Sequence, residues 1–190
     1  MQENRFRLKD ILKKDLNRFW DMQAKTEGIN TIGIVRKLKL ILKRPVLMKL
    51  IIFRCAQASV FNKWFPLLGI PVRMLNYMTS IILGIQIPVT TRIGGGLYLC
   101  HWGTIVVSKK AVLGENVVLF HDVTIGHEKG KCPVIGNNVY IAPGAKIFGE
   151  ITIGDNCKIG ANAVVNKSFP ADCTIAGIPA KIVKRIESVK

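Results

Sequence analysis

Three histidines in the second half of the chain are the residues whose type and spacing best suit chemistry. They are the only histidines among 190 residues and stand close together, at His101, His121 and His127. A neutral imidazole at the surface of a rigid scaffold can take a proton near pH 7 and so act as a general base. The alternative for each of them is a structural role, in which the ring binds backbone groups at a corner of the chain.

A repeat of six residues indicates the scaffold that carries these histidines. Blocks opening with Leu or Ile run as LGENVV, LFHDVT and IGH over residues 113–127, and as IGNNVY, IAPGAK, IFGEIT, IGDNCK and IGANAV over residues 135–164. This period fits neither an alternating strand nor a helix, whose repeat is about 3.6 residues. It is typical of a parallel β-helix, in which each short strand points one aliphatic residue inward. The sequence therefore predicts a mainly β fold built from hexapeptides.

The phase of the repeat places two histidines together. The inward positions before the second run of blocks are Ile87, Ile93, Leu99, Val107, Leu113, Leu119 and Ile125. Three hexapeptides complete one coil, and two extra residues fall between Leu99 and Val107, so Leu99 and Leu119 lie one coil apart. His101 and His121 each follow these leucines by two residues. We therefore expect them at one shared corner of neighbouring coils, ~4.8 Å apart.

The six-residue period also predicts the positions of the remaining corners and the end of the stack. His127 is expected at a different corner, at the base of a loop that holds about four extra residues before Ile135. Small or amide residues after the inward aliphatics are expected to supply left-handed backbone angles. They are Gly114, Gly126, Gly136, Asn137, Gly154 and Gly160. The period ends at SFPADC, residues 168–173, and residues 182–190 are expected to cap the stack as a strand or helix.

Charge divides the chain into two parts near residue 84. The formal net charge is +16, and residues 1–84 hold 16 basic and 5 acidic side chains, a net charge of +11. We predict a basic α-helical region over residues 1–84 and a β-helix domain with its carboxyl-terminal cap over residues 85–190. Helices are predicted within residues 7–24, within 31–43 and, in one or two pieces, between 46 and 84. Pro45, Pro66 and Pro71 are expected to bend them.

Cations interrupt the apolar stretches of the first part. No run reaches the ~18–20 apolar residues that cross a bilayer, and no signal peptide is recognisable, so we expect a cytoplasmic protein. Basic residues around Phe61, Trp64, Phe65 and Leu67 resemble an interfacial helix on anionic lipid, on the inner face of the membrane. The alternative is that these helices pack on the β-helix or in an oligomer. Nucleic acid is not an expected partner, because no nucleic-acid-binding signature is present.

Cysteine spacing argues against a disulfide framework and against a metal site. The five cysteines are Cys55, Cys100, Cys132, Cys157 and Cys173. Their number is odd and none form CxxC, which indicates reduced thiols. No metal is predicted, since ligand spacing is missing. Cys157 and Cys173 are expected to fill space at β-helix corners, and GGG at residues 94–96 is expected to be a coil corner without a phosphate site.

Residues 87–183, about half of the chain, resemble the hexapeptide-repeat acyltransferases of the serine acetyltransferase type. The shared features are GLYLxHxGTIVV, VTIG, the run VIGNNVYIAPGAKIFGxITIG, and AGIPAKIV. The resemblance implies a left-handed β-helix, a homotrimer, acetyl-CoA as the donor and a histidine base. The family's base matches His101, and His121, at the same corner, is the second catalytic candidate.

The resemblance also implies where acetyl-CoA binds. Its pantetheine arm is expected along the groove between adjacent β-helices of the trimer. The contacts map onto Gly126, His127, Ala142, Pro143, Gly160 and Ala161. Lys181, Lys184 and Arg185 are placed to meet the nucleotide phosphates. For Lys184 and Arg185 a solvated terminal charge cluster is the alternative.

Departures from the family pattern bear on the acceptor. The acidic residue that supports the base in the family aligns with Gln86, Cys100 replaces an acid beside the base, and a substrate-contacting histidine is replaced near Cys132. Gln86 and Trp102 are the candidate acceptor-binding residues; Trp102 can stack on a sugar or pack in the trimer interface.

The basic first half is closer in style to the enzymes of bacterial surface-polysaccharide pathways. We therefore predict an acetyl-CoA-dependent O-acetyltransferase that acetylates a saccharide hydroxyl, with a lipid-linked saccharide at the membrane as one form of acceptor. The alternatives are a serine O-acetyltransferase of cysteine synthesis and a non-catalytic β-helix scaffold.

Overall fold

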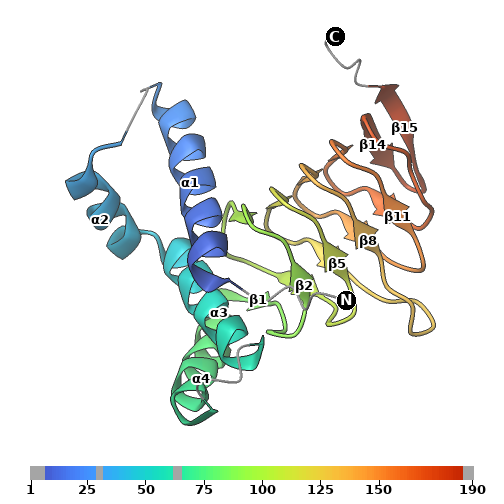
Figure 1. Ribbon diagram of the computed structural model, residues 1–190. Coiled ribbons are helices and arrows are strands. Elements are labelled where there is room, and N and C mark those ends of the chain that lie inside the picture. Colours follow the sequence, from blue (N-terminus) through green and yellow to red (C-terminus); the bar gives the residue numbers. More distant parts are fainter. Residues whose placement is uncertain (1–6, 29–31, 62–65, 186–190) are drawn as a thin grey trace.

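Four helices precede a parallel β-helix in the computed structural model, which describes residues 7–28, 32–61 and 66–185 (Figure 1). The helices are α1 (Leu8–Glu27), α2 (Ile34–Lys43), α3 (Pro45–Phe61) and α4 (Pro66–Leu83). They lie close to their predicted positions. Pro45 and Pro66 begin helices instead of bending them, because a proline at the first helical position loses no hydrogen bond. Pro71 lies inside α4. The division into two domains at residues 84 and 85 stays a prediction.

The strands form three sheets, one on each side of the β-helix. The first sheet holds β1 (Ile85–Gln86), β4 (Ile105–Val107), β7 (Thr124–Ile125), β10 (Lys146–Ile147) and β13 (Val164–Val165). The second holds β2 (Arg92–Ile93), β5 (Val112–Leu113), β8 (Val134–Ile135) and β11 (Thr152–Ile153). The third holds β3 (Tyr98–Leu99), β6 (Val118–Leu119), β9 (Tyr140–Ile141), β12 (Lys158–Ile159), β14 (Cys173–Gly177) and β15 (Ala180–Arg185).

Strand register confirms the predicted phase of the repeat. β3 pairs with β6 so that Leu99 lies beside Leu119, and Ile141 of β9 follows in the same row. Every residue predicted to point inward is buried, with at most 7% of its surface exposed. The two extra residues lie between β3 and β4. The predicted loop lies between β7 and β8, where Glu128 and Lys131 form a bridge. The parallel β-helix is therefore confirmed.

The glycine corners are built differently from the prediction. None of the residues expected to adopt left-handed angles has a positive φ. These residues are Gly114, Gly126, Gly136, Asn137, Gly154 and Gly160. At one corner, a Cβ on Gly114 would lie 2.7 Å from the carbonyl oxygen of Gly136, and a Cβ on Gly136 would lie 2.9 Å from the carbonyl carbon of Gly154. Glycine is needed here because neighbouring coils approach closely, so the expectation of left-handed angles is wrong.

Asparagines supply the left-handed angles at that corner. Asn116, Asn138 and Asn156 have φ of 57°, 56° and 58°, a conformation that asparagine tolerates better than most residues. Their amides form a ladder along the stack. Asn116 Nδ2 donates to Asn138 Oδ1 at 3.1 Å, Asn138 Nδ2 to Asn156 Oδ1 at 3.0 Å, and Asn156 Nδ2 to Asp172 Oδ1 at 2.8 Å. Side chains as well as backbone therefore hold adjacent coils in register.

An antiparallel hairpin closes the carboxyl-terminal end of the stack. β14 continues the third sheet beside β12, and β15 turns back along β14. The predicted terminal strand is confirmed as far as Arg185, and residues 186–190 lie outside the described residues. Cys157 and Cys173 are buried in the core, with their sulfurs 3.5 Å apart, and all five cysteines are free thiols.

Arg54 of α3 closes the other end of the β-helix. The first coil has no preceding coil to pair with, so its outward carbonyls need other donors. Arg54 is fully buried and donates to the carbonyl oxygens of Ile93 at 3.0 Å and Gly94 at 2.6 Å. Gln57 donates to the carbonyl oxygen of Thr91 at 2.9 Å. One face of α3 thus takes the place of a missing coil.

Asp15 of α1 completes this closure. Its carboxylate accepts from Arg54 Nε at 2.7 Å and from the backbone N–H groups of Gly96 at 2.7 Å and Leu97 at 2.9 Å. Burial raises the pKa of Asp15, while Arg54 and the two N–H groups favour its ionised form. Residues 94–96 are a coil corner, as predicted, and a carboxylate of the same chain binds it. Val46, Leu50 and Phe53 of α3 share one hydrophobic core with the coils, so α3 packs on the β-helix.

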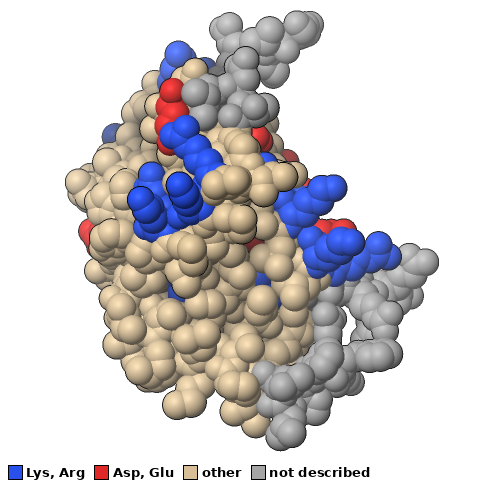
Figure 2. All heavy atoms as spheres, turned by 90° about the vertical axis from the view of Figure 1, so that its left-hand side faces the viewer, with Lys and Arg blue, Asp and Glu red and all other residues tan. Residues whose placement is uncertain are grey.

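The surface of α2 combines cations with exposed apolar side chains. None of its residues is buried. Its most exposed apolar residues, between 59% and 77% accessible, are Ile34, Val35, Leu38 and Leu42. Its cations are Arg36, Lys37, Lys39 and Lys43. Figure 2 shows this side of the molecule as a largely uncharged surface that carries separate groups of Lys and Arg side chains.

Most of the residues around which the interfacial helix is predicted fall, wholly or with their side chains, outside the part of the chain that the structure describes. Trp64 and Phe65 fall outside the described residues, as does the side chain of Leu67. Phe61, at the end of α3, is exposed. Among the described helices, none is both long and apolar enough to cross a bilayer.

We expect Asp15→Asn to lower the free energy of unfolding by about 3–5 kcal/mol, because it leaves the Arg54 charge buried without its counterion. Urea unfolding followed by circular dichroism measures the loss. Asp10→Asn is the matched control, since Asp10 lies on the same helix with its side chain 62% exposed. Equal midpoints for the two variants would show that the buried pair does not hold the end of the β-helix closed.

Lys49 of α3 gives a second prediction, on pH. Its Nζ is buried and donates to the carbonyl oxygen and Oδ1 of Asn76, both at 2.8 Å, and to Ser80 Oγ at 2.6 Å. Burial lowers its pKa from 10.5 to about 8. The unfolded chain therefore binds more protons in this window, so Lys49 makes stability rise with pH between about 8 and 10.5.

The wild-type protein should show this rise relative to Lys49→Met when unfolding midpoints are measured across that pH range. Lys39→Met, on exposed α2, is the control and should keep the wild-type slope. A Lys49→Met profile parallel to that of the wild type would contradict the lowered pKa.

Candidate active site

His101 and His121 lie together at one corner of the β-helix, as predicted. They follow β3 and β6 at matched positions, because these strands pair with Leu99 beside Leu119. Their ring centroids are 5.9 Å apart in an edge-on arrangement, and both side chains are exposed. The ring of Phe120 also lies near that of His101, with centroids 6.3 Å apart. The structure therefore presents two accessible imidazoles within reach of one substrate.

His127 is separate from this pair. It follows β7 of the first sheet, at the start of the loop between β7 and β8, and its side chain is exposed. This is the different corner that the phase of the repeat predicts.

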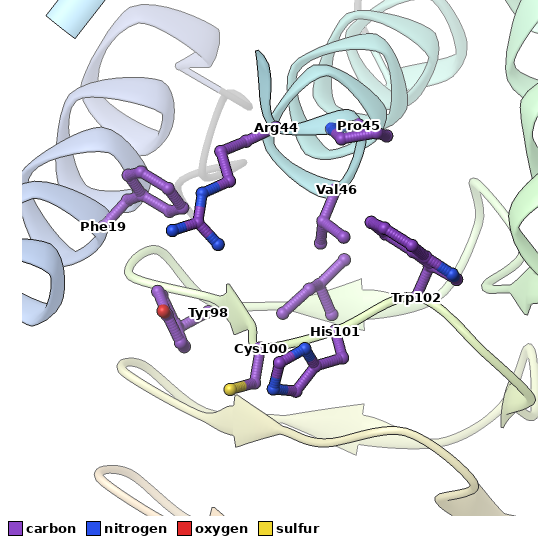
Figure 3. A pocket seen from close by; sticks show the side chains of 9 residues that line it. Phe19, Arg44, Pro45, Val46, Tyr98, Cys100, His101 and Trp102 are labelled. Carbon is purple, nitrogen blue, oxygen red and sulfur yellow. The ribbon is translucent and has the colours of Figure 1, made fainter. Parts of the chain in front are cut away.

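A pocket opens beside His101, between the helices and the first coil (Figure 3). It is lined by Phe19, Arg44, Pro45, Val46, Tyr98, Leu99, Cys100, His101 and Trp102. Three elements meet here: α1 supplies Phe19, the junction of α2 and α3 supplies Arg44, and the end of β3 supplies the rest of the polar wall. Trp102 is 58% exposed at the rim. The pocket places candidate acceptor-binding groups directly next to the candidate base.

The chemistry of this pocket is cationic and otherwise uncharged. Burial raises the pKa of the Cys100 thiol and the Tyr98 phenol, although Arg44 acts in the opposite direction on both. Both groups are therefore neutral at pH 7. No Asp or Glu lines the pocket. Within the described residues, no carboxylate lies within ion-pair distance of His101 either.

The sequence did not indicate the part of the pocket that comes from the helices. The six-residue period phases the coils against one another, but it carries no information on how α1 and α2 sit on the first coil. Phe19 and Arg44 had no motif that could mark them as site residues. The other predicted acceptor residue, Gln86, is exposed on β1 in the first sheet, whereas His101 follows a strand of the third.

Several residues predicted to contact acetyl-CoA lie in one column below the histidines. The column contains the residue two positions after the inward residue of each of four strands in the third sheet. Its members are His101 after β3, His121 after β6, Pro143 after β9 and Ala161 after β12. Ala142 and Gly160 precede the last two in the chain. Small side chains thus continue the edge on which the imidazoles stand. Gly126 and His127 belong to the corner after β7.

The predicted phosphate-binding cations lie at the far end of the stack. Lys181, Lys184 and Arg185 are exposed on β15, with Lys181 opposite Ala176 of β14. Four strand spacings of ~4.8 Å separate β3 from β14, a distance of ~19 Å. This is on the order of an extended pantetheine arm. Within the described residues, no group of His, Cys, Asp and Glu is arranged to hold a metal ion.

Comparisons with known proteins agree with this architecture. The family described as "Bacterial transferase hexapeptide (six repeats)" matches residues 132–167. The serine acetyltransferase of Brucella abortus strain S19 has a solved structure with a TM-score of 0.76 and 29% identity, covering 94% of this chain and 70% of that one. The structure of the same enzyme in complex with coenzyme A has a TM-score of 0.77 and 28% identity, covering 95% of this chain and 69% of that one.

Relatives in sequence point the same way. A serine acetyltransferase of Synechococcus elongatus is 35% identical over 117 residues, which are 60% of this chain and 48% of the relative. The chain thus spans about half the length of such relatives. The serine acetyltransferase of Helicobacter pylori is matched over 87% of its length and 78% of this chain, with 34% identity over 153 residues. The predicted likeness to surface-polysaccharide enzymes gains no support from these relatives. On its fold and on the near full-length match to the Helicobacter pylori enzyme, the chain belongs to the serine acetyltransferase family of hexapeptide-repeat transferases.

Proposed function

We propose that the protein is an acetyl-CoA-dependent O-acetyltransferase in which His101 is the general base. The observation that carries this proposal is an exposed imidazole beside a pocket, at the head of a column of small residues on the β-helix. A free alcohol is too weak an acid to ionise at pH 7, so its proton must be removed as it attacks. A non-catalytic scaffold would have no use for this arrangement.

The transfer step uses few groups. The acceptor oxygen attacks the thioester carbonyl carbon of acetyl-CoA while His101 takes the hydroxyl proton. The tetrahedral oxyanion needs a hydrogen-bond donor, and a backbone N–H at a coil corner can serve. Collapse of this intermediate breaks the carbon–sulfur bond and releases CoA, whose sulfur receives the proton from the imidazolium. His121, 5.9 Å away between ring centroids, is placed to assist proton transfer.

We propose that acetyl-CoA lies along the column from His101 to β15, with its nucleotide at the cations of β15. Support comes from the coenzyme A complex of the Brucella abortus relative and from the ~19 Å between β3 and β14. Lys181 and Arg185 then meet the phosphates. Because the arm is expected between neighbouring β-helices, we also propose a homotrimer.

Two acceptor classes are in question. The relatives are named serine acetyltransferases, which favours L-serine, the alternative of the sequence analysis, over a saccharide. The local residues argue against L-serine. Gln86 stands where the family carries the acid that supports the base, Cys100 replaces an acid beside the base, and a substrate-contacting histidine is replaced near Cys132. We therefore propose a small hydroxyl compound as the acceptor, with L-serine as the first one to test.

We further propose that α2 contacts anionic membrane surfaces. Four apolar residues of α2 are exposed, Ile34, Val35, Leu38 and Leu42, and four cations stand among them. Such a helix lies on a lipid surface by burying its apolar side chains while the cations meet the headgroups.

His101→Ala should lower kcat for acetyl transfer by roughly 10²–10⁴ and leave acetyl-CoA binding unchanged, because a general base acts on the acceptor proton. Release of the CoA thiol, assayed with L-serine and with a panel of sugars, measures the rate. His121→Ala is the companion variant, and we expect a smaller loss. If His121→Ala were inactive and His101→Ala remained active, His121 would be the general base and His101 the accessory residue.

Leu38→Glu with Leu42→Glu should abolish sedimentation of the protein with vesicles that contain phosphatidylserine, since each buried leucine and each nearby cation contributes to binding. The control is Ile178→Glu, an equally exposed apolar residue in the turn between β14 and β15. Binding of the wild type should also weaken in high salt. Vesicle binding that survives the α2 substitutions would reject this helix as the contact.

A further inference from the structure

Among the described residues that line the pocket beside His101, Arg44 is the one Lys, Arg, Asp or Glu. It lies between two helices, where its backbone N–H donates to Leu40 of α2 at 2.9 Å and its carbonyl accepts from Leu47 of α3 at 3.0 Å. Figure 3 shows the guanidinium directed toward Phe19 and Tyr98, above the segment that carries Cys100 and His101. Two helix ends therefore fix the backbone from which this cation reaches into the pocket.

A neutral amide holds the guanidinium of Arg44. Gln23 is buried, and its Oε1 accepts from Arg44 Nη2 at 3.3 Å while its Nε2 donates to Glu27 Oε1 at 2.7 Å. Glu27 in turn pairs with Arg36 at 2.7 Å. The nearby carboxylate is thus engaged by a different arginine, and the amide of Gln23 is oriented with its oxygen toward Arg44.

The charge of Arg44 is not neutralised within the described chain. No carboxylate oxygen of a described residue lies within 4.0 Å of its guanidinium nitrogens. A guanidinium has five N–H donors in a fork that suits a carboxylate or phosphate, and the bond to Gln23 uses one of them. Arg54, by contrast, has its charge fully matched by Asp15. Arg44 therefore has N–H donors left to bind an anion in the pocket.

The other walls offer an ammonium group no carboxylate. They are formed by residues of which none is acidic, namely Phe19, Pro45, Val46, Tyr98, Leu99, Cys100, His101 and Trp102. A cationic acceptor would face Arg44 across a pocket without a carboxylate, and like charges at such distances repel. An anionic acceptor would gain charge-assisted hydrogen bonds.

We propose that the acceptor carries an anionic group, a carboxylate or a phosphate, that Arg44 binds while the acceptor hydroxyl faces His101. This inference rests on the proposed acetyl transfer and specifies its substrate class. Recognition requires the anion, and an ammonium group on the acceptor weakens it. The aromatic walls, Phe19 and Tyr98 inside and Trp102 at the rim, pack against the carbon skeleton.

Acceptors of equal size and different charge test the proposal. The only charged group of D-glycerate is a carboxylate. L-serine has a carboxylate and, in place of the 2-hydroxyl, an ammonium group. Glycerol carries no charge, and the only charged group of serinol is an ammonium. We expect kcat/KM to fall in that order, with serinol the poorest. sn-Glycerol 3-phosphate replaces the carboxylate by a phosphate and decides which anion is preferred. Serinol or L-serine exceeding D-glycerate would overturn the proposal.

Arg44→Gln removes the charge and keeps hydrogen-bonding capacity. It should lower kcat/KM for D-glycerate roughly 10- to 100-fold, the weight of a charge-assisted hydrogen bond, through a raised KM. The loss with glycerol, which has no anionic group, should be much smaller. Arg92→Gln, an exposed cation of β2, is the matched control. An equal loss for glycerate and glycerol would assign Arg44 a structural role instead.

Binding without turnover separates this inference from the proposed function. Calorimetric titration of the wild type and of Arg44→Gln with D-glycerate, and separately with acetyl-CoA, reads each site directly. Glycerate binding that is lost in Arg44→Gln supports the anion site even if no acetyl group is transferred, a result that would overturn only the proposed reaction. Absent binding of both glycerate and glycerol 3-phosphate to the wild type would overturn the anion site, whatever the acetyl-CoA titration shows.

Discussion

The unpaired first coil is the constraint on which the rest of the molecule depends. A β-helix satisfies the backbone of each coil with the next, so its first coil faces outward with free carbonyl and N–H groups. Arg54 and Asp15 bind both kinds of group at once, and their own charges cancel in the process. The stack can begin only where α1 and α3 deliver these two side chains. The helices are therefore part of the β-helix's closure and are not an appendage to it.

The same closure creates the pocket. Once α3 lies across the first coil, the residue before it, Arg44, and the facing side of α1, with Phe19, come to stand over the end of β3. His101 is at that end because it stands two residues after the inward Leu99 of β3. The site is thus a consequence of how the open end is covered. A different set of helices over the same coils would leave the base in place and change what it can act on.

The repeat made most of the β-helix predictable. A strict period fixes inward positions, coil length and the pairing of Leu99 with Leu119, and hence the position of His101 beside His121. Corner geometry was harder to predict from the sequence, because glycine can serve either a left-handed backbone angle or a close approach of two coils. The structure shows that Gly114 allows the close approach and that Asn116 adopts the left-handed angle. Contacts between the helices and the first coil have no period at all. Arg54, Asp15 and Arg44 accordingly enter the sequence analysis only through the net charge of residues 1–84, whereas Arg54 and Asp15 are buried as a pair and Arg44 points into the pocket.

The asparagine ladder would allow the number of coils in the stack to vary, and the length of the donor limits that number. Each coil that carries an asparagine at this corner can bond to any other such coil, so whole coils could be added or removed without disturbing the closure at either end. Each added coil would move β14 and β15 away from His101 by one strand spacing, ~4.8 Å. A donor of fixed length, bound as proposed with its thioester at His101 and its phosphates at β15, tolerates no such change. Under that proposal the number of coils between β3 and β14 matches the length of the cosubstrate, and it is set by the reach of a small molecule more than by the stability of the fold.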